Sequence, residues 1–188
     1  MSAILVSICY PPPARAQVPP QTAWVSRYNE PGNDHEKGLD VAVDAGGNVY
    51  VTGGASWGGS NREDYLTLKH DRFGNVLWSA HYDGPDHLWD EARALALDGL
   101  GNVIVTGLSY GSGTGYDLTT VKYDAGGNQL WVRRYNGPGN GNDWASAMVL
   151  DEAGNVYVTG ASGGDSVTIK YDTDGNELWV GLYGSGRP

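Results

Sequence analysis

The sequence predicts an all-β fold built from β-propeller blades. One pattern recurs along the chain, opening at Trp24, Trp78 and Trp131 and again at Trp179. The spacings between these Trp residues are 54, 53 and 48 positions, a period typical of propellers and solenoids. Short runs rich in Val, Leu, Thr, Tyr and Trp alternate with Gly, Asn and Asp, and no stretch has apolar residues at helical spacing over a dozen positions. These observations favour strands throughout.

The second copy shows what one repeat contains. Four runs read as strands, namely 91–98, 102–108, 117–124 and 128–135. Four strands joined mostly by short turns form an antiparallel meander, which is the construction of one propeller blade. We therefore expect each repeat to be one four-stranded blade.

Two of the three connections inside each repeat have the pattern Asp-x-x-Gly-Asn. An Asp side chain accepts from backbone amides two residues on, Gly adopts positive φ and Asn tolerates it, so the pattern suits tight hairpins. The six segments are 44–48, 71–75, 98–102, 124–128, 151–155 and 172–176.

The first and last strands of each repeat have distinct chemistry. On the first strand, small residues such as Ala92, Ala94 and Ala96 are expected on one face, as crowding near a propeller axis requires. The recurring Trp is expected on the outermost strand, where a large aromatic fills the gap between blades. We assign this structural role to Trp24, Trp78, Trp131 and Trp179.

The predicted domain organisation is three blades plus one extra N-terminal strand, in an incomplete ring. The propeller repeat domain covers 24–188, with blades at about 36–82, 90–135 and 143–183, and the extra strand lies near 21–28. Closed propellers have about four to eight blades, so three leave open edges. A truncated reading frame, a piece of a longer chain and a homodimer that closes a six-bladed ring all remain open as explanations.

The combination of motifs resembles a known family. Trp-x-x-x-Tyr, Asp-x-x-Gly-Asn-Val-Tyr-Val-Thr-Gly and Thr-x-Lys-Tyr-Asp, in this order over about residues 24–183, are similar to the bacterial SBBP β-propeller repeat and, more distantly, to quinoprotein-type propeller blades. The resemblance implies a secreted or cell-surface propeller, commonly one module of a larger bacterial protein. It transfers no catalytic residue.

Charge and the N-terminal segment narrow the partners and the compartment. The formal net charge of −10 argues against binding nucleic acid or anionic lipid. Residues 1–16 combine a short apolar run with Ala-Arg-Ala and read as a signal peptide, and 17–23 as a Pro-rich linker, so we expect a secreted, periplasmic or cell-surface protein. The apolar run is too short to insert as a membrane span, and the single Cys9 allows no intrachain disulfide.

A recurring lysine on the third strand is the main buried-charge prediction. Lys69, Lys122 and Lys170 are expected to be structural, because a catalytic Lys has no reason to recur in every blade. Their expected partners are the carboxylates at the start of the first strand, which are Glu36, Asp90 and Asp143. No metal site or cofactor is expected, since the 172–176 turn resembles a calcium loop only at its start.

The loops on one face of the blades carry the ligand candidates. Aromatic residues beside Asn and Asp suit contact with a sugar or a protein, although an aromatic in a Gly-rich loop can also fold back to anchor it. The ligand-face candidates are Trp57, His87, Trp89, Tyr110, Tyr116 and Trp144.

The functional prediction is an exported, non-catalytic scaffold or recognition module that binds a surface polysaccharide or protein through this face. No nucleophile motif, Gly-rich phosphate loop or paired His motif is present, so the chain is expected not to be an enzyme. The alternative is a fragment of a propeller hydrolase or lyase whose other blades carry the catalytic residues, with His35 and His87 as the only candidates on this chain.

Overall fold

The computed structural model describes residues 23–29, 35–56 and 62–184 as twelve strands in three separate sheets. The predicted signal peptide, the linker up to residue 22, and Trp57 lie outside these residues. Each sheet is a four-stranded antiparallel meander in sequence order, as predicted for a blade. Among the described residues there is no helix that could cross a membrane.

Each blade begins with its innermost strand. Blade 1 consists of β1 (Glu36–Val43), β2 (Val49–Ser56), β3 (Glu63–His70) and β4 (Val76–Tyr82). Blade 2 consists of β5 (Asp90–Leu97), β6 (Val103–Gly111), β7 (Gly115–Tyr123) and β8 (Gln129–Tyr135). Blade 3 consists of β9 (Asp143–Leu150), β10 (Val156–Ser162), β11 (Asp165–Tyr171) and β12 (Glu177–Tyr183).

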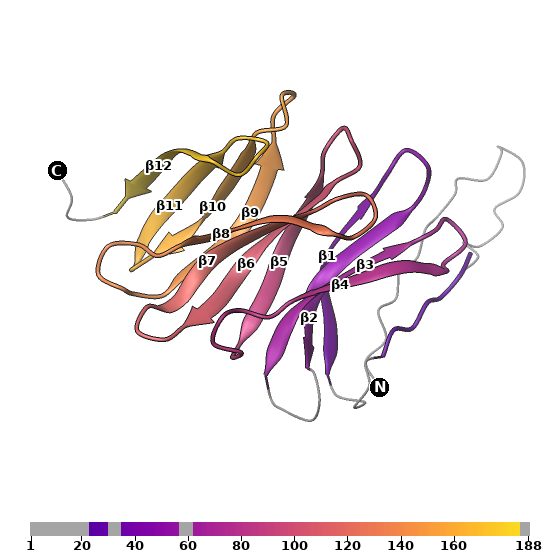
Figure 1. Ribbon diagram of the computed structural model, residues 1–188, viewed down its shortest axis with the longest axis horizontal. Coiled ribbons are helices and arrows are strands. Elements are labelled where there is room, and N and C mark those ends of the chain that lie inside the picture. The colour runs from indigo at the N-terminus through magenta and orange to yellow at the C-terminus, as the bar shows by residue number, and fades with distance from the viewer. Residues whose placement is uncertain (1–22, 30–34, 57–61, 185–188) are drawn as a thin grey trace, which may run out of the picture.

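The blades stand side by side in an arc. Figure 1 shows β5 between β1 and β9, so the three first strands line the inner side, and blade 2 is packed between the other two. The described blades do not close a ring, which confirms the predicted fold class of an incomplete propeller. Residues 23–29, expected as an extra strand, make no strand pairing.

The two larger core clusters lie between blades, and a third, formed by Ala55, Leu66 and Leu68, lies on blade 1 with Tyr28 packed against it. One layer joins blade 1 to blade 2 through residues such as Tyr50, Tyr65 and Val105, and a second joins blade 2 to blade 3 through Leu118 and Ile169. Burial of apolar surface between sheets therefore holds the array together, because a single blade has no interior of its own.

The Asp-x-x-Gly-Asn turns are hairpins closed by their own Asp. In the turn from β7 to β8, Asp124 Oδ1 accepts from the backbone N–H groups of Gly126 and Asn128, both at 2.9 Å, and Oδ2 accepts from Asn128 Nδ2 at 2.9 Å. The side chain and then the backbone N–H of Asn128 lower the pKa of Asp124. Gly127 has φ +88°, which a side chain would strain.

A β-bulge in the first strand corrects the predicted small-residue face. The register of β5 against β6 shifts between Ala92 and Ala94, so these two residues point to opposite faces, although the sequence pattern placed them on one. The same shift occurs in β1 and in β9. At the bulge the two backbones approach closely, and a Cβ on Gly107 would lie 1.9 Å from the carbonyl oxygen of Glu91. This contact explains the Gly of the repeated Val-Thr-Gly.

A pair of side chains, here called the Trp–Lys clamp, fixes each blade to the next. Trp78 Nε1 and Lys69 Nζ donate to one acceptor, the carbonyl oxygen of Ala125 in the last turn of blade 2, at 3.1 and 3.2 Å. Trp131 Nε1 and Lys122 Nζ donate in the same way to the carbonyl oxygen of Thr173 in blade 3, both at 3.2 Å.

The clamped turn places its glycine under the indole. A Cβ on Gly127 would lie 2.8 Å from the Trp78 ring, and one on Gly175 would lie 2.8 Å from the Trp131 ring. The repeated Trp and the repeated turn glycine are therefore two halves of one contact between neighbouring blades.

The expected partners of the repeated lysines were wrong. Lys122 pairs with Asp98 at 3.0 Å, with both side chains almost fully buried, and Lys170 lies 3.7 Å from Asp151. Asp98 and Asp151 come just after the end of the first strand of their blades. The lysine lies at the end of the third strand, which is at the same end of the blade, so it reaches this Asp. Asp90 lies at the opposite end and accepts from the backbone N–H of Gly84 at 2.7 Å, holding the connection between blades.

Candidate functional site

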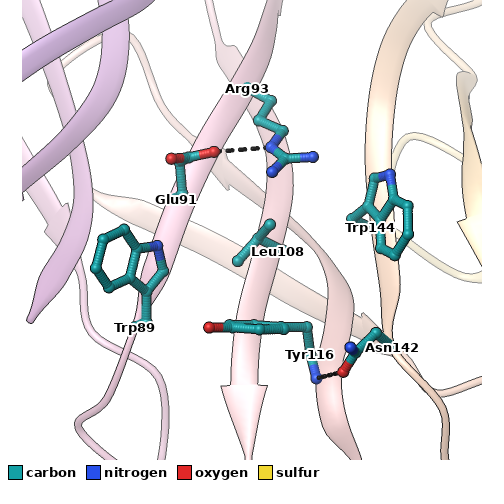
Figure 2. A pocket seen from close by; sticks show the side chains of 7 residues that line it. All are labelled: Trp89, Glu91, Arg93, Leu108, Tyr116, Asn142 and Trp144. Carbon is teal, nitrogen blue, oxygen red and sulfur yellow. Dashed lines mark hydrogen bonds and ion pairs between the residues drawn. The ribbon is translucent and has the colours of Figure 1, made fainter.

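A groove of about 490 Å³ opens between blades 2 and 3 at the end of the array that carries the interblade loops. Its size is that of a small-ligand site. The lining residues come from the segment before β5, from β5, β6 and β7, and from the start of blade 3; they are Trp89, Glu91, Arg93, Leu108, Tyr116, Asn142 and Trp144. Figure 2 shows Trp89 and Trp144 on opposite sides, with Leu108 and Tyr116 between them.

A charged network supports the floor of the groove. Arg93 Nε donates to Glu91 Oε1 at 2.8 Å, and the Lys37 ammonium contacts both Glu91 and Glu63, the latter at 2.6 Å. Burial alone would raise the pKa of Glu91, but Lys37 and Arg93 lower it overall. Glu91 is therefore an ionised hydrogen-bond acceptor at neutral pH.

The aromatic side chains are held in place by neighbours. The Lys37 ammonium lies 5.5 Å from the centre of the Trp89 ring, a cation–π distance. Asn142 Oδ1 accepts from the backbone N–H of Tyr116 at 3.1 Å, and the Tyr110 ring packs edge-on against Tyr116 with 5.4 Å between centroids. Partial fixation of this kind reduces the entropy lost when a ligand binds.

The structure gathers some of the ligand-face candidates and not others. Trp89, Tyr116 and Trp144 line the groove, whereas Tyr110 supports Tyr116 from outside it. His87 lies apart in the loop before β5, exposed, with its Nδ1 2.6 Å from Asp83 Oδ2. That hydrogen bond raises the pKa of His87.

Three carboxylates converge beside this loop. One oxygen from each of Asp64, Asp83 and Asp90 lies within 4.8 Å of the others. Burial, together with the smaller effect of the charges of Asp83 and Asp90, raises the pKa of Asp64 to about 7. Asp64 therefore titrates near neutral pH, unlike the turn aspartates.

The groove combines apolar ring faces with a few polar groups. Indole and phenol faces pack against the C–H faces of a pyranose, while Glu91 accepts hydrogen bonds and Asn142 can both donate and accept. Of the lining residues, Glu91, Arg93, Leu108 and Asn142 were not predicted. Glu91 and Arg93 depart from the equivalent positions in the other repeats, Lys37 and Leu39 in blade 1, and this departure was the available signal.

Comparison with known proteins supports the architecture. Residues 130–166 match the family model SBBP, described as a beta-propeller repeat, which confirms the resemblance predicted from the sequence. No curated protein matches the chain.

Among solved structures, the chain is similar to one described as a "putative gluconolactonase", with a TM-score of 0.48 and 15% identity. The similarity covers 90% of this chain, which spans 56% of the length of that protein. The expectation that the chain is not an enzyme is contradicted by this match, because the protein is described as an enzyme. A match at this identity assigns no reaction to the present chain.

Proposed function

We propose that the protein is a propeller module that binds a neutral polysaccharide in the groove between blades 2 and 3. The observation that carries the proposal is the placement of two indoles, Trp89 and Trp144, on opposite sides of one groove with polar groups between them. Flat apolar faces with few fixed polar partners are the usual means of holding a sugar ring in orientation.

The electrostatics fit a neutral sugar better than an anionic one. Glu91 contributes a negative charge to the groove, and the chain as a whole carries −10, so an acidic polysaccharide would meet repulsion outside the reach of Arg93. Export through the segment 1–16 remains a prediction, and it would bring the groove to polysaccharides outside the cell.

Binding in this groove suits a recognition module and equally the substrate site of a propeller hydrolase. Intact oligosaccharide recovered after binding favours the first role, whereas shortened or ring-opened products favour the second. The two roles differ only in the fate of the bound sugar, and one sample distinguishes them.

The test is a tryptophan-fluorescence titration of the full chain with neutral hexasaccharides of glucose, xylose, mannose and N-acetylglucosamine. We expect one series to bind and Trp144→Ala to weaken that binding about tenfold or more, since buried aromatic anchors dominate such contacts. Leu100→Ala is the control, because Leu100 is exposed in the turn between β5 and β6 and is not among the residues that line the groove. Absence of binding across the series, or equal losses in the two variants, contradicts the proposal.

A further inference from the structure

One face of blade 3 is open where the same face of blades 1 and 2 is covered by the next blade. Thr52 in β2 and Thr106 in β6 are buried, but Thr159 at the same place in β10 is exposed. On this open face Val149 is 64% exposed and Trp179 is 45% exposed. Its cross-strand neighbours, Tyr157 and Lys170, complete a partly apolar surface.

The complementary face, at the other end of the array, is covered in part: Leu66 and Leu68 in β3 are buried with Tyr28 packed against them, whereas the first strand is exposed. Val41 in β1 is 52% exposed, whereas Leu95, its equivalent in β5, is 8% exposed because blade 1 packs on it. The two ends of the array therefore present the two halves of an interface that the chain itself forms twice, between blades 1 and 2 and between blades 2 and 3.

The Trp–Lys clamp indicates which partner fits the open face. In blades 1 and 2 its donors bind the carbonyl oxygen of an Asp-x-x-Gly-Asn turn, with the turn glycine under the indole. In blade 3 the clamp residues are Lys170 and Trp179, and within the described residues the Trp179 Nε1 has no hydrogen-bond acceptor. A fitting occupant must therefore present the last turn of a blade of this same repeat.

The last turn of blade 1 has this form, and the chain's own segment 23–29 already holds it. Trp24 Nε1 donates to the carbonyl oxygen of Arg72 at 3.1 Å, and a Cβ on Gly74 would lie 2.7 Å from the Trp24 ring. Residues 23–29 therefore occupy the position on blade 1 that β4 occupies on blade 2.

This segment is held by side chains, because Trp24 stacks on His70 with 5.9 Å between ring centroids and Tyr28 packs against Leu66 and Leu68. It makes no strand pairing, and a hollow of about 380 Å³ lined by Ala23, Trp24, Arg72 and Phe73 lies beside it. Its sequence, Trp-Val-Ser-Arg-Tyr, has the same pattern as Trp-Val-Gly-Leu-Tyr in β12, so the two segments are suited to the same place.

We propose that residues 23–29 are a built-in cap on blade 1, and that blade 3 of a second copy replaces this cap. Trp179 and Lys170 of one copy then clamp the 71–75 turn of the other. Two copies joined in this way at both ends bring together six of the described blades, a number within the range of closed propellers. The contact is head-to-tail, so closure requires it to form twice. The inference is independent of the proposed polysaccharide site.

The test compares two equivalent tryptophans for opposite effects. The mass of the full chain is measured by light scattering over a concentration series for the wild type, Trp24→Ala and Trp179→Ala. We expect a monomer–dimer equilibrium. Trp24→Ala should lower the dissociation constant of the dimer about tenfold, because the cap is weakened, and Trp179→Ala should raise it at least tenfold. Circular dichroism melts of the same samples establish that each variant is folded.

Three results overturn the inference. They are a wild-type chain that stays monomeric up to the highest concentration reached, a Trp179→Ala variant that dimerises as the wild type does, and a Trp24→Ala variant that dimerises less. If Trp179→Ala is poorly folded, Lys170→Met replaces it, since Lys170 is part of the open face and is expected to weaken the dimer in the same direction.

Discussion

Substituting a turn glycine tests whether the contact between blades requires a residue without a side chain beneath the Trp indole ring. Gly127 and Gly101 occupy the same place in their Asp-x-x-Gly-Asn turns, with φ of +88° and +80°. A Cβ at Gly101 would lie 3.8 Å from its nearest neighbour, Ala125, which is ordinary contact, but one at Gly127 would lie 2.8 Å from the Trp78 ring. The two Ala variants therefore share the backbone strain and differ in the indole contact.

The expected magnitudes come from these two effects. Gly101→Ala should lower the free energy of unfolding by about 1–2 kcal/mol, the cost of a left-handed L-residue. Gly127→Ala carries the same strain and roughly 1–3 kcal/mol more, because the Trp78 ring must move from a packed site. The assay is urea unfolding at equilibrium with the wild type alongside. Equal losses in the two variants would refute the claim that the glycine under the indole secures neighbouring blades.

Three further perturbations have defined outcomes. Trp131→Ala should lower the free energy of unfolding by about 3 kcal/mol in the same urea assay, as truncation of a large packed aromatic does, and a loss below about 1 kcal/mol would contradict its role between blades. Lys122→Met should cost about 3 kcal/mol because it leaves the buried Asp98 carboxylate without its cationic partner. Lys170→Met, whose longer ion pair is more exposed, should cost clearly less in a monomeric sample, and the reverse order would be inconsistent with the described pairs. Asp64 has a folded-state pKa raised from 3.8 to about 7, so its contribution to stability falls as pH rises through that window. The melting temperature of Asp64→Asn should therefore gain a few °C relative to the wild type between pH 5 and pH 8. A difference in melting temperature that stays constant over this pH range would contradict the raised pKa.

The blades were predictable because each repeat carries its own boundaries. The expected strand at 117–124 is β7 at Gly115–Tyr123, and the expected strand at 128–135 is β8 at Gln129–Tyr135. Turn chemistry is local, so six copies of one Asp-x-x-Gly-Asn pattern defined six hairpins from sequence alone.

The bulge and the lysine partners were not predictable by the same means. Strict alternation along a strand assigns Ala92 and Ala94 to one face, and one extra residue between them reverses that assignment. The partner of Lys122 depends on which end of the blade the lysine reaches, and that is set by cross-strand register. Such register comes from pairing across the sheet, which the residue spacing used for the prediction did not encode.

The candidate groove was found in part. Trp89, Tyr116 and Trp144 were named because aromatics in the loops stand outside the repeating pattern. Glu91 and Arg93 were missed, because they lie within a predicted strand and reach the groove only through packing of blade 2 against blade 3. Residues that break a repeat inside a strand are therefore as informative as residues in its loops.

Hydrogen exchange of the tryptophan indole N–H groups, measured by NMR in a sample diluted until it is monomeric, tests the repeated Trp contact most directly. We predict slow exchange for Trp78 and Trp131, whose indoles donate to the next blade, and fast exchange for Trp179, which should slow as concentration rises and the open face becomes covered. Fast exchange at Trp131, or slow exchange at Trp179 in the monomer, would contradict the claim that one repeated Trp contact joins the blades and is left open at blade 3.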